Sequence, residues 1–191
     1  MLKKILLGIG VLLLLFILFI IFAPAPATTP GSETSDTSTD MKTYTNESYG
    51  FSMEYPEDWS YTEANASSVV TINSPKQSSS DVFSENVNVV VQTLPPDMTL
   101  AMYAEKSMKD LNTYVGNFDL MEQKDVTIAG QPGKRLVYQG VYPGQENEYK
   151  FLQEYVVKDG SAYLLTYTAV PAEFDTFVSQ AEVILASFSL Q

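Results

Sequence analysis

The amino-acid sequence predicts an α+β domain in which an antiparallel sheet of about six strands carries helices on both faces, preceded by one transmembrane helix. Three observations predict this fold class. A continuous apolar run opens the chain, from Ile5 to Phe22. Short segments with strand-like alternation, separated by turn residues, occupy the middle and the second half of the sequence. Two segments with helical periodicity interrupt or follow them, near residues 100–115 and 171–188.

The run from Ile5 to Phe22 has the length and composition of a membrane span. It contains 18 residues without a charged or polar side chain, and a helix of that length extends roughly 27 Å, close to the ~30 Å core of a bilayer. Lys3 and Lys4 precede the run, and the next basic residue is Lys42. This asymmetry predicts a cytoplasmic N-terminus and an extracytoplasmic remainder. We therefore expect a single-pass protein of the cell membrane whose first partner is the lipid bilayer.

The residues after this run leave one alternative open. The small residues Ala25 and Ala27 have the spacing that signal peptidase reads, so cleavage near Ala27 would give a secreted protein. The apolar run is longer than the core of most signal peptides, which favours a retained signal-anchor over residues 1–22. Residues 23–42 are rich in Pro, Ser and Thr and predict a disordered linker. Residues 43–191 are then the folded domain.

The first half of this domain shows three strand patterns. Phe51, Met53 and Tyr55 alternate with polar residues until Pro56, which ends the strand. A short apolar stretch, residues 69–72, predicts a second strand, and alternating valines predict a third over residues 87–91.

Two amphipathic helices are predicted from apolar spacing and end signals. Thr99 is a favourable N-cap for a helix of about four turns that ends at Gly116. Pro171 is expected to open the last helix, since proline is favoured in the first turn. The apolar stripe of this last helix consists of Phe174, Phe177, Val178, Ala181, Ile184, Leu185 and Phe188.

Between the helices, turn residues separate three long alternating segments. Asp159-Gly160 is a strong hairpin signal, because a type I′ turn needs positive φ at both central positions. In the segment from Tyr149 to Val157, apolar side chains occupy both faces of the expected strand. A sheet with two apolar faces must be covered twice, which places helices on both sides.

Composition excludes several function classes. The chain has 23 acidic and 11 basic residues and a net charge of −12, so it repels phosphate backbones, and we expect no nucleic-acid partner. Histidine and cysteine are both absent from the sequence. This absence excludes thiol nucleophiles, Ser-His triads, His-containing zinc sites and thiolate-bound iron–sulfur clusters. We expect no catalytic residues and no cofactor.

Only a few residues qualify as candidate sites. Glu54, Glu57 and Asp58 surround a proline turn and are weak candidates for a hard cation such as Ca²⁺, although no calcium-loop motif accompanies them, and a solvated acidic turn is the favoured interpretation. Asn46 and Asn65 each begin an N-glycosylation acceptor pattern. Five aromatic residues fit either a recognition surface or the core, with the core favoured: Tyr49, Trp59, Tyr61, Tyr142 and Tyr149.

Four segments of the sequence form a recognisable pattern: the opening YGFSMEYPEDW from Tyr49 to Trp59, the stretch from Thr127 to Pro132, the strand from Tyr163 to Ala169, and the closing Ala186-Ser187-Phe188. In this order they resemble the PsbP-like family. The resemblance implies an α-β-α sandwich and a non-enzymatic role. Photosynthetic members are extrinsic subunits of photosystem II. This chain lacks both histidine and a plastid transit pattern, so only the fold is carried over, not photosystem binding.

These observations lead to two competing functional hypotheses. The favoured one is a membrane-tethered extracytoplasmic domain that acts as a non-catalytic protein-binding or assembly module, with an unidentified membrane or extracytoplasmic protein as partner. The competing one is a cation- or glycan-binding domain, or a hydrolase, that uses carboxylates and tyrosines.

Overall fold

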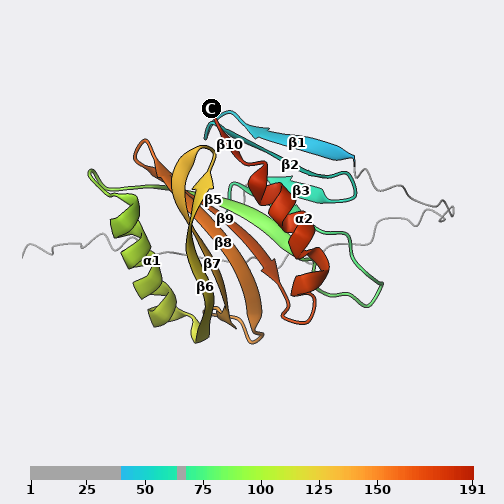
Figure 1. Ribbon diagram of the computed structural model, residues 1–191. Coiled ribbons are helices and arrows are strands. Elements are labelled where there is room, and N and C mark those ends of the chain that lie inside the picture. The colour runs from blue at the N-terminus through green and yellow to red at the C-terminus, as the bar shows by residue number, and fades with distance from the viewer. Residues whose placement is uncertain (1–39, 64–67) are drawn as a thin grey trace, which may run out of the picture.

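The computed structural model describes residues 40–63 and 68–191 (Figure 1). The expected membrane span from Ile5 to Phe22, its cleavage position near Ala27, most of the linker and the acceptor Asn65 lie outside the described residues. Within the described part, no helix has the length and apolar character needed to cross a bilayer. The first strand begins at Met41, so the last two residues assigned to the linker are part of the folded domain.

The described residues form two antiparallel sheets and two helices (Figure 1). In chain order the elements are β1 (Met41–Asn46), β2 (Phe51–Pro56), β3 (Ser60–Glu63), β4 (Val70–Asn73), β5 (Asn86–Thr93), α1 (Leu100–Tyr114), β6 (Gly116–Ile128), β7 (Gln131–Val141), β8 (Tyr149–Lys158), β9 (Ser161–Ala169), α2 (Phe174–Ala186) and β10 (Ser189–Leu190). The α+β class is thereby confirmed.

The strands divide between the sheets differently from the prediction of one sheet with about six strands. The larger sheet has seven strands in the order β3-β4-β5-β9-β8-β7-β6, and the smaller has three in the order β1-β2-β10. The strand that begins at Phe51 pairs with β1 and β10 and not with the large sheet. Its alternation correctly indicated one buried face, but side-chain periodicity carries no information on which strand supplies the hydrogen bonds.

The expected hairpins are present. Asp159 and Gly160 have φ values of 49° and 73°, which join β8 to β9 through a turn with positive φ at both positions. Ala129 and Gly130 have φ values of 48° and 74° and join β6 to β7 in the same way. Strand β6 lies at one edge of the large sheet and contains two register shifts, which bend this edge and interrupt its regular hydrogen bonding.

Helix α1 covers one face of the large sheet. The Thr99 Oγ1 atom accepts a hydrogen bond from the Met102 N–H at 3.3 Å, which confirms the predicted N-cap. The helix presents Tyr103, Ser107 and Leu111 to the interior. The buried residues on this side, called the α1-side core, are Leu94, Tyr103, Leu111, Val115, Leu136, Tyr138, Tyr142, Tyr149, Phe151, Tyr155, Ala162 and Leu164.

Helix α2 lies on the opposite face, beside the small sheet (Figure 1). It begins at Phe174 and not at Pro171, because the Glu173 N–H donates to the Val170 carbonyl at 3.0 Å and closes a turn before the helix. The predicted apolar stripe is buried as expected, except that Val178 is half-buried. It packs with β2, β5 and β9 in a cluster called the α2-side core, which includes Phe51, Met53, Trp59, Val87, Leu152, Val156, Leu165, Tyr167, Phe177 and Ile184.

Strand β8 shows why both faces require cover. Phe151 and Tyr155 point into the α1-side core, whereas Leu152 and Val156 point into the α2-side core. This confirms the two-faced strand predicted from the sequence, with the residues divided between the faces as expected.

Candidate functional site

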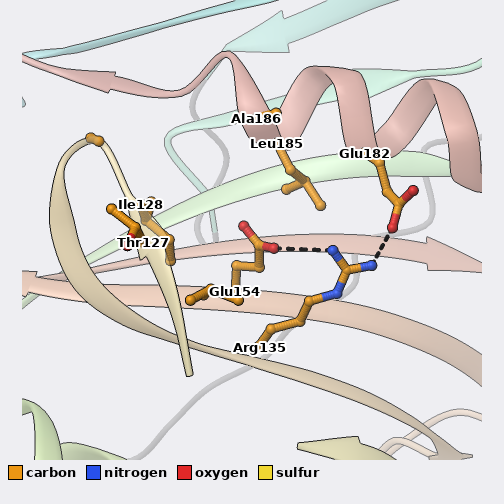
Figure 2. Close-up of a pocket in the computed structure, with 9 residues that line it drawn as sticks. Thr127, Ile128, Arg135, Glu154, Glu182, Leu185 and Ala186 are labelled. Atoms are coloured by element: carbon orange, nitrogen blue, oxygen red, sulfur yellow. Dashed lines mark hydrogen bonds and ion pairs between the residues drawn. The ribbon is translucent and has the colours of Figure 1, made fainter. Parts of the chain in front are cut away.

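A groove lies on the α2 side of the large sheet, between the β6–β7 hairpin and the C-terminal half of α2 (Figure 2). It has a volume of about 480 Å³. Its lining residues come from three separate parts of the chain: Val126, Thr127, Ile128, Ala129, Arg135, Glu154, Glu182, Leu185 and Ala186.

The hairpin forms one wall of the groove because Gly133 lets Ile128 approach the strands. A Cβ atom at Gly133 would lie 2.5 Å from the Ile128 Cδ1 atom and 2.9 Å from the Tyr155 carbonyl oxygen, closer than real Cβ contacts. The glycine therefore makes room for the Ile128 side chain over β7. The buried Ile128 side chain gives this wall its apolar character.

Strand register places two charged residues of the groove, Arg135 and Glu154, in one row with Lys124. Lys124 on β6 is opposite Arg135 on β7, which is opposite Glu154 on β8. Residues in register on neighbouring strands share a face. All three therefore lie on the α2 side of the sheet, where Glu182 approaches from the helix (Figure 2).

Three carboxylates surround the Arg135 guanidinium. Its Nη1 atom lies 3.4 Å from Glu154 Oε1, and its Nε atom lies 3.4 Å from Glu122 Oε1. Its Nη2 atom contacts Glu182 Oε1 directly, as Figure 2 shows. The Arg135 side chain is only 18 % exposed, so these interactions are partly shielded from water.

The groove carries more negative than positive charge. Lys124 Nζ lies 3.0 Å from Glu122 Oε1, so two cations face three carboxylates. Burial raises the pKa of the Glu154 carboxyl, and the charge of Glu182 raises it further, while Arg135 and Lys124 oppose the shift. An incoming cation would therefore relieve an unfavourable buried charge at Glu154.

The acidic turn predicted as a weak metal candidate does not form a site of this kind. Glu54, Glu57 and Asp58 are all exposed, and the Glu54 backbone is engaged with Ser187, whose Oγ accepts from the Glu54 N–H at 2.7 Å. Across residues 40–63 and 68–191, no group of three or more acidic side chains is placed to hold a metal ion.

The other candidates divide between surface and core. The Asn46 side chain is held locally: its Nδ2 donates to the Tyr44 hydroxyl, and its Oδ1 accepts from the Tyr49 N–H, each at 3.0 Å. Among the five aromatic candidates, the core interpretation is confirmed for three and wrong for two. Trp59, Tyr142 and Tyr149 are buried, and Tyr49 and Tyr61 are each 46 % exposed.

Sequence reasoning did not identify the charged residues of the groove as a site. Arg135 and Glu154 are 19 positions apart, and Arg135 and Glu182 are 47 apart. The hairpin register would have paired Lys124, Arg135 and Glu154, but no pattern in the sequence brings the helix residue Glu182 to them.

Comparison with known proteins shows relatives of the same fold. The family model described as "PsbP-like protein" matches residues 16–190. The solution structure of cyanobacterial PsbP (CyanoP) from Synechocystis sp. PCC 6803 superposes with a TM-score of 0.57 at 18 % identity, over 84 % of this chain and 98 % of that one.

Two further structures are similar. LpqN of Mycobacterium tuberculosis, described as involved in cell envelope biogenesis, has a TM-score of 0.59 at 16 % identity, over 82 % of this chain and 93 % of its own. PA94 of Pseudomonas aeruginosa, described as a protein of unknown function and putative regulator, has a TM-score of 0.56 at 15 % identity, over 77 % of this chain and 94 % of its own. No curated protein sequence matches the chain.

Proposed function

The chain belongs to the PsbP-like family, and from this premise we propose that it is a non-catalytic binding module, tethered to the outer face of the cell membrane, that holds a partner protein in the groove between the β6–β7 hairpin and α2. The observation that carries the proposal is the groove itself. It combines an apolar wall with a few charged side chains, the composition typical of ligand-binding concavities.

The geometry at Arg135 favours binding over catalysis. Each of the three carboxylates around the guanidinium is occupied by an ion pair. A carboxylate that acts as a general base must reach a substrate proton, and each of these three has an oxygen engaged by the guanidinium instead. The same charges are well suited to fixing the orientation of a docked chain.

The proposed location rests on the N-terminal run. Residues 5–22 would anchor the domain in the bilayer, and the following Pro/Ser/Thr-rich residues would hold it beyond the lipid headgroups. The envelope role in the description of LpqN, a protein of similar fold, accords with this placement.

Crosslinking of the full chain in its native membrane tests the proposal. Ala186 lines the groove and is exposed, so Ala186→Phe would fill the groove without disturbing the core. Ala101→Phe makes the same change at an exposed position on α1, across the sheet. We expect a partner protein that crosslinks to the wild type and to Ala101→Phe but is lost with Ala186→Phe.

Three outcomes would contradict the proposal. Identical crosslinked species from both variants would show that the groove does not hold the partner. Glycan or peptide turnover that disappears with Glu154→Gln would favour the competing hydrolase hypothesis. Recovery of the protein in the soluble fraction, with a mature N-terminus near Thr28, would contradict the proposed tether.

A further inference from the structure

The groove has two chemically distinct halves. Its apolar half comes from the hairpin tip and the helix end, and consists of Val126, Ile128, Ala129, Leu185 and Ala186. Its charged half consists of Arg135, Glu154 and Glu182. A ligand that fills both halves needs an aliphatic stem of several carbons and a charged end, which are the properties of long basic side chains.

The charged half has unused capacity to accept hydrogen bonds. One oxygen of Glu154 faces Arg135 at 3.4 Å, a long contact for a charge-assisted hydrogen bond. Within the described part of the chain, its other oxygen accepts no hydrogen bond. Figure 2 shows that this oxygen points away from Arg135, into the space below Leu185. Glu154 as a whole is only 9 % exposed.

The sign of the charge selects a cation as the occupant. Arg135 is already contacted by three carboxylates, so an incoming anion would meet Glu154 and Glu182 before it met an unpaired positive charge. From Met41 onward, the sequence holds 20 acidic and 9 basic residues, so the whole domain repels anions and attracts basic segments.

We propose that the groove receives a lysine or arginine side chain of the partner protein, with its aliphatic stem against Ile128, Leu185 and Ala186 and its cationic end between Glu154 and Glu182. This inference rests on the proposed function and names the chemistry by which the partner is recognised. The partner segment is therefore basic where it enters the groove, and association weakens as salt concentration rises.

Arg135 supplies a direct probe of occupancy. It is the only arginine in the sequence. Its Nε–H therefore gives a single side-chain resonance in the ¹⁵N spectrum of the labelled full chain in zwitterionic detergent micelles. Three blocked tripeptides serve as ligands, with lysine, norleucine or glutamate at the centre and alanine on each side. We expect the lysine peptide alone to shift the Arg135 resonance in a saturable way.

Matched variants then locate the cation. Glu182→Gln and Glu154→Gln should each lower the affinity for the lysine peptide by about fivefold, the effect of losing one partly exposed charge pair. Glu105→Gln makes the same charge change on exposed α1, across the sheet, and should leave the affinity within about twofold. Backbone amide spectra verify folding. Because Glu182 is 47 % exposed, its variant keeps the test valid even if Glu154→Gln fails to fold.

Each other outcome has a definite meaning. Preference for the glutamate or norleucine peptide, equal affinity in Glu182→Gln, or no saturable shift overturns the inference. A shift of the Arg135 resonance on simple dilution of the protein would assign the groove to a second copy of the chain and also overturns it. If the lysine peptide does not bind but the Ala186→Phe variant still fails to crosslink to the partner, the proposed function stands and only the proposed recognition of a cation is wrong.

Discussion

Aromatic side chains fill the α1 side of the large sheet, called the closed side. The α2 side, called the open side, has a groove beside the helix. On the α1 side, the Phe151 ring lies 4.9 Å from the Tyr138 ring and 4.8 Å from the Tyr142 ring, measured between centroids. The two tyrosine hydroxyls are 2.6 Å apart in a buried hydrogen bond, in which one donates and the other accepts. On the α2 side, the polar groups of the same strands include Arg135 and Glu154, beside a groove.

The difference shows how one set of strands supports two tasks. Neighbouring residues point to opposite faces, so Phe151 stabilises one side while Leu152 serves the other. Packing of the aromatic side chains on the α1 side stabilises the fold, so less packing energy is required from the α2 side. Charged groups can then remain partly exposed near the groove, where a partner can reach them.

The largest expected effect comes from removing a buried aromatic ring on the α1 side of the large sheet. Phe151→Ala should lower the free energy of unfolding by about 3–5 kcal/mol, because it removes a buried ring and leaves a cavity among aromatic neighbours. Urea unfolding of the detergent-solubilised full chain, followed by fluorescence of Trp59, measures this change. Trp59 is the only tryptophan in the sequence and is buried in the α2-side core. A loss below about 1 kcal/mol would mean that this side is packed less tightly than its ring contacts indicate.

A second prediction concerns the close approach of the chain to Gly140, also on the closed side. A Cβ atom there would lie 2.5 Å from Val115 Cγ1 and 2.8 Å from the Gly116 carbonyl oxygen. Because the second contact is with backbone, Gly140→Ala should destabilise the fold by about 1–3 kcal/mol. Gly116→Ala is the control, since its Cβ would approach nothing closer than 3.5 Å. Equal unfolding midpoints for the two variants would contradict the prediction.

Two adjacent cations sharpen the comparison between the faces. Arg135→Gln should cost about 2 kcal/mol at pH 7, since it leaves the buried Glu154 without its cation. Lys134→Gln should change stability by less than about 0.5 kcal/mol, because its partner Asp125 is 81 % exposed.

The Arg135→Gln loss also has a pH signature. Without the guanidinium, the pKa of folded Glu154 rises further, so the folded variant binds a proton more readily than the unfolded chain. The variant should therefore regain stability as pH falls toward the ordinary range of glutamate. Urea titrations at several pH values measure this, and a loss that does not vary with pH would exclude Glu154 as its source.

The smallest expected effect involves Glu85, which is 1 % exposed. Burial raises the pKa of this carboxyl, and the nearby charges of Asp81 and Glu173 raise it further, against hydrogen bonds from the backbone. A raised folded pKa means that the native state holds the proton more tightly, so stability falls as pH rises from the ordinary glutamate value through the folded one. Glu85→Gln should make the pH dependence of the unfolding free energy shallower over this window. An unchanged dependence would contradict the prediction.

Local signals in the sequence were reliable where one element decides its own structure. The Thr99 cap, the Asp159-Gly160 turn and the two-faced alternation of β8 all appear as predicted. The Pro171 signal was misplaced by a turn, because a favourable first-turn residue does not specify where helical hydrogen bonding begins.

Residues close together in the chain specify the periodicity of each strand and helix and the positions of the turns, and composition specifies the excess of negative charge. Packing between distant segments places β2 in a separate sheet and brings Arg135, Glu154 and Glu182 to one groove. The physical reason is that backbone hydrogen bonds between strands are the same for every residue type, so strand pairing depends on how whole faces pack and not on local pattern.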